Sequence, residues 1–185
     1  MTARPKQPTQ PRQTPTIRIP LPAVRPHHDP LHQLVIHNIP YEEKETPEIF
    51  ITKIASIKEI PLNSTDFTCF RALNKQRENN DGSTAPVIIV TFANPNLKNQ
   101  FKKYQGPITA ANIIPASNNS NPIYINENLP KAQRVLFHSV RQFAKTHEYK
   151  HAWTRDGEIY IRKDDTAKVH NITNEDSLTN LLQHH

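Results

Sequence analysis

Proline is distributed very unevenly along this chain, and that distribution limits how much of it can fold. Eight of the 17 prolines lie within the first 30 residues, together with several Gln and Thr and few large apolar side chains. Such a segment buries too little apolar surface to offset the entropy lost on ordering. We therefore predict that residues 1–30 form a disordered arm, which is either a plain tail or an extended polyproline segment offered to a partner domain.

The positive charge of the chain is concentrated in the same arm. The formal net charge of the 185 residues is +6, and residues 1–30 carry five Lys or Arg against one Asp. Residues 31–121 and residues 122–185 each carry nine basic and eight acidic residues. A basic balance favours polyanionic partners. Any basic patch on the folded part must therefore come from the arrangement of its side chains.

Cysteine content and hydropathy restrict the class of protein. The single cysteine, Cys69, excludes a disulfide framework within the chain and argues against a Cys-based zinc site. The N-terminus lacks the apolar stretch of a secretory signal, and no segment approaches the roughly 18 apolar residues that span a bilayer. The sequence predicts a soluble intracellular protein, cytoplasmic or nuclear, that does not enter a membrane.

Residues 31–117 predict one mixed α+β domain. Thr46 and Pro47 supply the N-cap and first residue of a helix that Pro61 stops, and Asn94-Pro95 opens a second helix. Strands are predicted for residues 34–39, 67–73, 87–92 and 108–114. The resulting order, β-α-β-β-α-β, is that of ferredoxin-like domains, which include the RNA-recognition fold.

Residues 118–185 predict a second, smaller α/β unit. Asn118 to Pro122 indicates a linker, and residues 123–125 a short strand. An amphipathic helix follows over residues 130–147, then a hairpin with Asp156-Gly157 as its two-residue turn, and a last helix from about residue 174 to 182. No heptad pattern is sustained, so the chain predicts no coiled coil of its own.

The predicted hairpin brings aromatic and basic side chains to one face. A two-residue loop at Asp156-Gly157 pairs Trp153 with Tyr160 and Arg155 with Glu158, and strand alternation then separates a polar face from a core face. The polar face would carry His151, Trp153, Arg155, Tyr160 and Arg162. Aromatic rings stack on bases and Arg binds phosphates, so this face suggests single-stranded nucleic acid. The alternative is that Trp153 and Tyr160 pack under the helix.

The helix predicted over residues 130–147 carries a basic ridge. Arg134, His138, Arg141 and Lys145 are spaced four, three and four residues apart, which puts them on one helical face. The ridge is either a nucleic-acid contact or an ordinary solvated face.

In the first domain, the two central strands lack the stacking aromatics usual in RNA-recognition domains. Arg71 is the candidate phosphate contact there, whereas Lys75 and Arg77 fit a solvated loop.

Other chemistry finds no support in the sequence. No phosphate-binding glycine loop, nucleophile elbow or HExxH motif occurs, and Cys69 lies in a predicted strand as a small core residue. The ten histidines show no zinc-like spacing. We therefore expect no enzyme activity, no metal and no cofactor.

Two segments carry a resemblance to a known family. Ile123-Tyr124-Ile125-Asn126-Glu127 and the run from Trp153 to Asp164, with the basic helix between them, resemble the C-terminal part of baculovirus FP proteins and of the first-reading-frame proteins of insect LINE-type retroelements. The resemblance implies an RNA-recognition-like domain followed by a small α/β domain, with nucleic acid gripped between them. It implies basic contacts at Arg71, Arg141, Arg155, Arg162 and Lys163, with Tyr124 and Trp153 as aromatic contacts or supports.

Together these patterns predict a non-catalytic protein that binds single-stranded RNA or DNA, with RNA favoured. The resemblance implies a role as a ribonucleoprotein component or chaperone of viral or retroelement origin. Self-association would not use a coiled coil. The alternative is a protein–protein interaction module without nucleic-acid binding. The expected contact residues are Arg71, Tyr124, Arg134, Arg141, Lys145, Trp153, Arg155, Tyr160, Arg162 and Lys163.

Overall fold

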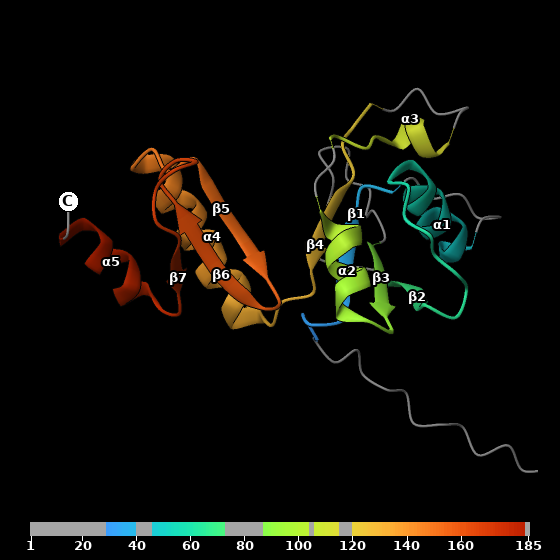
Figure 1. Ribbon diagram of the computed structural model, residues 1–185, viewed down its shortest axis with the longest axis horizontal. Helices are drawn as coiled ribbons and strands as arrows, with labels where there is room; N and C mark the ends of the chain where they lie inside the picture. Colours follow the sequence, from blue (N-terminus) through green and yellow to red (C-terminus); the bar gives the residue numbers. More distant parts are fainter. Residues whose placement is uncertain (1–28, 40–45, 73–86, 104–105, 115–119, 184–185) are drawn as a thin grey trace, which may run out of the picture.

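The computed structural model describes residues 29–39, 46–72, 87–103, 106–114 and 120–183. Within these ranges the protein is mixed α+β with two antiparallel sheets that lie in two adjacent units (Figure 1). We call residues 29–127 the first unit and residues 130–183 the C-terminal unit. The predicted disordered arm lies outside the described residues except for Asp29 and Pro30, as do the predicted loop cations Lys75 and Arg77.

The sheet of the first unit has four strands. They are β1 (Gln33–His37), β2 (Phe67–Ala72), β3 (Val87–Phe92) and β4 (Tyr124–Glu127). Their order is β2-β3-β1-β4, and the pairs β2–β3, β1–β3 and β1–β4 are all antiparallel. The strand β3, apolar at every position but one, occupies an inner place, as expected for a strand buried on both faces.

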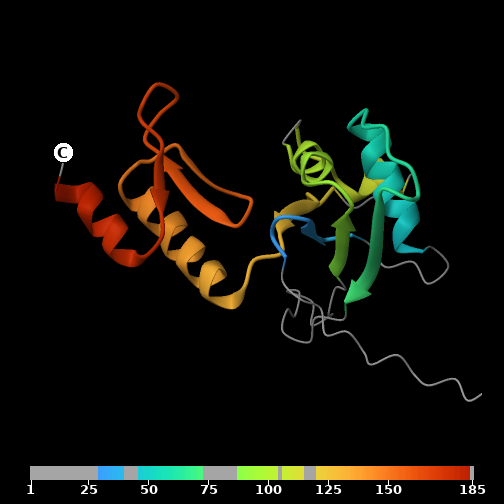
Figure 2. The same ribbon diagram turned by 60° about the horizontal axis from the view of Figure 1, so that its bottom comes forward.

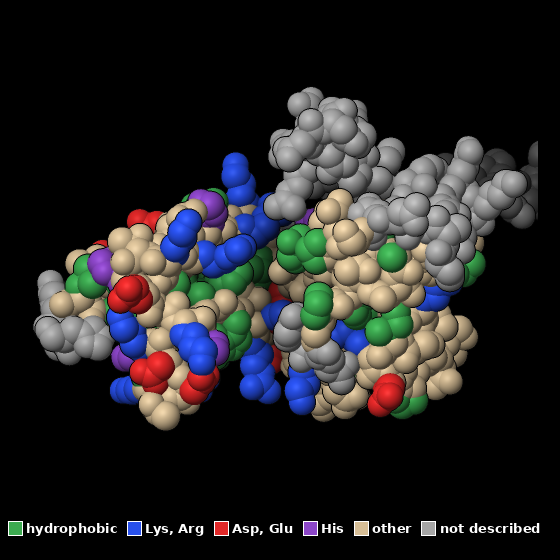
Figure 3. Space-filling view, turned by 90° about the horizontal axis from the view of Figure 1, so that it is seen from above, with side chains coloured by type: hydrophobic (Ala, Val, Ile, Leu, Met, Phe, Trp, Pro, Cys, Tyr) green, Lys and Arg blue, Asp and Glu red, His purple; other side chains and the backbone are tan. Residues whose placement is uncertain are grey.

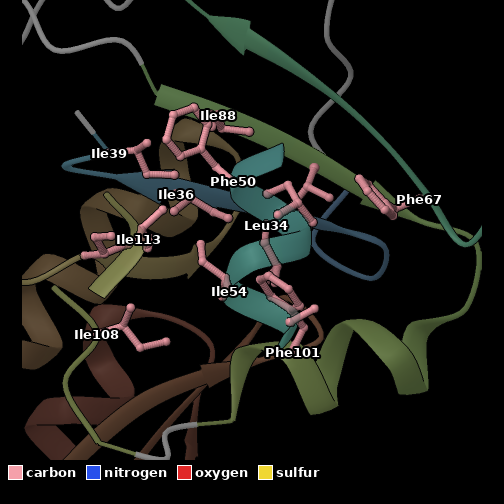
Figure 4. Close-up of a cluster of buried hydrophobic side chains, with 14 of the residues drawn as sticks. Leu34, Ile36, Ile39, Phe50, Ile54, Phe67, Ile88, Phe101, Ile108 and Ile113 are labelled. Atoms are coloured by element: carbon pink, nitrogen blue, oxygen red, sulfur yellow. The ribbon is translucent and has the colours of Figure 1, made fainter. Parts of the chain in front are cut away.

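Two helices cover one face of this sheet. Helix α1 (Pro47–Ile57) and helix α2 (Pro95–Lys102) both begin with proline at the first helical position, as predicted. The side chain of Asn94 caps α2 by accepting a hydrogen bond from the backbone N–H of Asn96 at 2.8 Å. The core between helices and sheet is built from fully buried side chains that include Leu34, Ile36, Phe50, Ile54 and Phe101 (Figure 4).

Two expectations for the first unit are wrong. Residues 108–114 do not form a strand, because a short helix, α3 (Ala110–Ile113), begins there with Thr109 and Asn112 in a capping box. The strand predicted at residues 123–125 was placed in the second unit, but it is the edge strand β4, which pairs with β1 in the first sheet. The first error arises because the Ile and Thr side chains of this run also favour a strand. The second arises because strand pairing between distant segments leaves little signal in the local sequence.

The C-terminal unit packs one long helix against a three-stranded sheet (Figure 2). Helix α4 (Lys131–Thr146) matches the predicted helix, and α5 (Glu175–Gln183) matches the last one. Strands β5 (His151–Arg155) and β6 (Glu158–Arg162) form the hairpin, and β7 (His170–Ile172), which was not predicted, extends it on the β6 side. The core includes Val140, Ala144, Ile159, Ile161 and Ile172.

The predicted hairpin register is confirmed pair by pair. Trp153 lies opposite Tyr160, Arg155 opposite Glu158 and His151 opposite Arg162. The turn residues Asp156 and Gly157 both have positive φ, at 54° and 86°, as a type I′ turn requires. Ile159 and Ile161 face the core against α4. Trp153 and Tyr160 therefore lie on the opposite face of the hairpin and do not pack under the helix.

Among the described residues, no helix is long and apolar enough to cross a membrane.

Candidate nucleic-acid interface

A cleft of about 410 Å³ lies between the two units. One wall is the face of the first sheet that the helices leave uncovered, and the other is the basic ridge of α4. The sheet contributes Val35, His37, Ala72, Val87 and Ile89, and the chain between the units contributes Asn126, Glu127, Asn128 and Leu129. From the C-terminal unit come Arg134, Phe137, His138, Arg141 and Thr154.

The basic wall follows directly from the helical spacing of the sequence. Arg134, His138 and Arg141 lie on successive turns of α4, and all three side chains are exposed. Val140 and Ala144 hold another side of the helix against the hairpin sheet. Figure 3 shows lysine and arginine side chains gathered where the C-terminal unit faces the first unit. The ridge is therefore part of a cleft and not an isolated solvated face.

The sheet wall is mostly apolar, and two aromatic side chains lie on the same sheet face beyond the residues that line the cleft. Val35 pairs with Ile89 in register, and Phe70 continues the same row on β2. Phe70 is 43% exposed, and Tyr124, which pairs with His37 on the other edge strand, is 53% exposed. The sequence did not predict Phe70 as a contact, because stacking aromatics are expected on the two central strands and Phe70 lies on the edge strand β2. Strand alternation from the buried Phe67 would have found it.

The outer face of the hairpin forms a second surface. Trp153 stacks on Tyr160, with ring centroids 5.6 Å apart and ring planes 21° apart. The side chain of Arg155 is 69% exposed beside this pair. Tyr160 donates a hydrogen bond to the carboxylate of Glu158, which raises the pKa of the phenol. Because α4 covers the other face of the hairpin, these aromatic groups do not line the cleft.

One carboxylate joins the cations beside this surface. Asp165 contacts Lys150, lies 2.7 Å from Nε2 of His151 and accepts a hydrogen bond from Arg162 at 3.4 Å. Hydrogen bonds from Lys150 and His151 lower the pKa of Asp165. Arg162 is thus held in part by the protein itself, and its side chain is only 28% exposed. Of the two hairpin arginines, Arg155 is the more available to a ligand.

Three other predicted contact residues lie elsewhere. Arg71 is on the helix-covered side of the sheet, with its guanidinium 4.9 Å from the ring centre of Phe50. Lys163 lies 4.9 Å from the ring centre of Tyr149 and donates to the carbonyl of His147, at the end of α4. Lys145 is exposed on α4, beyond the residues that line the cleft. The structure thus brings together Arg134 and Arg141, and separately Trp153, Arg155, Tyr160 and Arg162.

A largely buried polar cluster joins the two units beside the cleft. Lys98, on α2, lies 3.1 Å from the carboxylate of Glu127 and 2.7 Å from that of Asp156. Lys102 lies 3.2 Å from Glu127 and donates to the backbone and side chain of Thr154. We call these five residues the polar junction. Sequence reasoning missed it, because nothing local marks Lys98 or Glu127 as buried.

Opposing influences act on the pKa of Glu127. Burial raises it, but Lys102, the backbone N–H of Gly157 and Lys98 together outweigh burial, so the pKa lies below its ordinary value. Burial lowers the pKa of Lys102, against the pull of Glu127. The junction is therefore a set of charges that depend on one another, in which Lys98 and Glu127 are shielded from water and Asp156 is 35% exposed.

Comparison with known proteins identifies one part of the chain. Residues 130–182 match the family described as Baculovirus FP protein domain 2. The match runs from the residue before α4 into α5, and so covers nearly the whole C-terminal unit. It confirms the resemblance to baculovirus FP proteins over these residues. No curated protein matches the chain.

Proposed function

We propose that this chain, whose C-terminal unit matches the family described as Baculovirus FP protein domain 2, binds single-stranded nucleic acid. The proposed site is the cleft between the first sheet and helix α4, and RNA is the favoured ligand. The observation that carries the proposal is that two different walls face each other across one cleft. Arg134, His138 and Arg141 line one wall, and the apolar sheet face around Val35 and Ile89 lines the other. Cations suit phosphates, and an apolar face suits unstacked bases.

The two walls have separate tasks in this proposal. The arginines of α4 neutralise phosphates, which gives affinity without sequence preference and a strong dependence on salt. Bases lie on the open sheet, where Phe70 and Tyr124 offer exposed rings at the edges. A single strand fits such a site because its bases are free to turn away from the backbone, whereas paired bases are not.

The outer hairpin face is a second contact in the same proposal. Trp153, Tyr160, Arg155 and Arg162 place a stacked aromatic pair next to two guanidinium groups. A strand that leaves the cleft around the hairpin would meet this face next. Its contribution is expected to be smaller, because Asp165 partly neutralises the cations around it.

We further propose that the first unit is an RNA-recognition-like domain. The antiparallel order β2-β3-β1-β4, with α1 and α2 on one face, supports this view. The extra helix α3 before β4 departs from the simple β-α-β-β-α-β pattern. A role in a viral or retroelement ribonucleoprotein would follow from nucleic-acid binding of this kind and depends on it.

The decisive experiment measures binding of the full chain to a fluorescently labelled single-stranded RNA over a series of salt concentrations. We expect Arg134→Ala/Arg141→Ala to weaken binding by about tenfold or more. The slope of log affinity against log salt should also fall by about 0.7 for each phosphate that is no longer neutralised. The matched control is Lys103→Ala/Lys168→Ala, which removes the same charge from exposed sites outside the cleft.

The outcomes separate the proposal from its alternatives. If the control weakens binding as much as the cleft variant, net charge alone attracts the RNA and the cleft is not the site. If a duplex of the same sequence binds equally well, the single-strand preference is wrong. If no RNA binds even at low salt, the protein-interaction hypothesis replaces this one.

A further inference from the structure

We infer that Glu127 is a positioning residue, which fixes the C-terminal unit against the first unit and so sets the geometry of the cleft. The inference rests on the proposed function, because the placement of the two units affects binding only if nucleic acid lies between the two walls of the cleft. It concerns a carboxylate whose hydrogen bonds go to Lys98 and to the hairpin turn.

Glu127 is the last residue of β4, yet its carboxylate binds the hairpin turn of the other unit. The backbone N–H of Asp156 donates to it at 2.8 Å and that of Gly157 at 3.2 Å. The side chain of Glu127 is fully buried. Two adjacent N–H groups that converge on a carboxylate make a directional contact, because both bonds are kept only in one orientation of the turn.

Lys98 fixes the same turn from a third segment. Its ammonium group donates to Glu127 at 3.1 Å, to Asp156 at 2.7 Å and to the carbonyl oxygen of Pro30 at 2.9 Å. An ammonium group has three protons, so its hydrogen-bonding capacity is filled. Helix α2, the hairpin turn and the segment before β1 therefore meet at one buried nitrogen. Asn99 adds a further hydrogen bond to Asp156 at 3.1 Å.

This arrangement suits orientation better than it suits stability. Removing charges from water is costly, and a buried ion pair often contributes little net stability relative to apolar groups of the same shape. Its distinguishing property is that a small displacement leaves a buried charge unpaired. An apolar contact would let the units slide across each other. The polar junction instead favours one placement, the one in which Arg134 and Arg141 face the open sheet.

The cleft lies beside this fixed point. Glu127 and Thr154 belong both to the lining of the cleft and to the polar junction. Asn126 and Asn128, the neighbours of Glu127, line the cleft as well. A rotation of the hairpin about the junction would therefore carry the whole of α4 toward or away from the sheet, with the largest movement at the end far from the junction.

The test compares Glu127→Gln with Glu148→Gln in the full chain. Glutamine keeps the size of glutamate and removes its charge, and Glu148 is an exposed glutamate in the C-terminal unit. Spin labels at Thr52→Cys on α1 and Gln142→Cys on α4, in a Cys69→Ala background, report the distance between the units by pulsed electron resonance. Affinity for labelled single-stranded RNA is measured on the same variants without spin labels.

We expect Glu127→Gln to broaden the distance distribution and to weaken RNA binding by about tenfold, with Glu148→Gln unchanged in both. An unchanged distribution would overturn the inference, whether or not affinity fell. If Glu127→Gln does not fold, the same distance measurement on Asp156→Asn tests the junction through its other carboxylate, since asparagine also tolerates positive φ and lacks the charge that Lys98 contacts. If the parent protein binds no RNA, the proposed function fails while the distance measurement still decides the role of Glu127.

Discussion

Trp153 stacks on Tyr160 across the hairpin, on the face that α4 does not cover. Because Trp153 is the only tryptophan in the chain, its fluorescence reports on this surface alone. The aromatic pair and the cleft are separate surfaces, so they can be tested separately.

We predict that single-stranded RNA quenches the fluorescence of Trp153. A base that stacks on the exposed side of the aromatic pair would provide the quenching contact, and such stacking contributes roughly 1–3 kcal/mol per base. The measurement is a tryptophan emission titration beside an anisotropy titration with the same RNA. RNA that binds by anisotropy without changing the emission would remove the hairpin face from the binding site and leave the cleft.

A second prediction concerns the open sheet face beside the cleft. Phe70→Ala should weaken RNA binding by about 1–3 kcal/mol if a base stacks on that ring. The free energy of unfolding should fall by about 1–2 kcal/mol, because the ring is only 43% exposed and its covered part is lost as well. Chemical denaturation checks the second value. The control is Leu182→Ala, which trims another exposed apolar side chain on α5, far along the chain from the cleft.

A third prediction concerns the hairpin turn. Gly157 has φ of 86°, and a Cβ built there would lie 2.8 Å from Cγ of Pro30. Gly106 also has positive φ, at 111°, but a Cβ there meets nothing within 4 Å. Both Gly→Ala changes strain the backbone, at a cost of about 1 kcal/mol. Only Gly157→Ala also collides with the first unit, so it should lower the melting temperature more than Gly106→Ala does. Equal decreases would show that Pro30 moves aside without cost.

A fourth prediction concerns the single thiol. Cys69 packs against the core of the first unit, and burial, followed by the charge of Glu48, raises its pKa to about 12. The reactive thiolate is therefore scarce at neutral pH. We expect a thiol reagent to label the native protein much more slowly than the urea-unfolded protein at pH 8. Rapid labelling of the native state would show that β2 opens readily from the sheet edge.

The fifth prediction is a dependence of stability on acid. The pKa of Glu127 in the folded protein lies below its ordinary value of 4.5, so the unfolded chain binds the proton more readily. The stabilisation from Glu127 is complete above the unfolded value and is lost as pH falls through the folded value. Urea denaturation from pH 7 to pH 3 should therefore show a smaller loss of stability on acidification in Glu127→Gln than in the parent. Curves with the same pH dependence would assign the acid sensitivity to other carboxylates.

Local patterns determined much of the C-terminal unit. The Asp156-Gly157 turn fixed the pairing of Trp153 with Tyr160, because positive φ at two adjacent positions permits one hairpin register. The four-three-four spacing of Arg134, His138, Arg141 and Lys145 placed them on one face of α4, because a helix repeats every 3.6 residues. Each of these features is settled within about 15 residues, so the sequence alone was enough.

Tertiary structure decided what these local features face. The amino-acid sequence placed β4 with the C-terminal unit, but its hydrogen bonds go to β1, some ninety residues earlier. Likewise, the sequence marks Lys98 and Glu127 as ordinary charged residues, whereas the meeting of α2, β4 and the hairpin turn buries both. The basic ridge of α4 is determined by helical periodicity. Its place opposite an apolar sheet depends on contacts between segments far apart in the chain, because burial and strand pairing are properties of the assembled fold and not of any one segment.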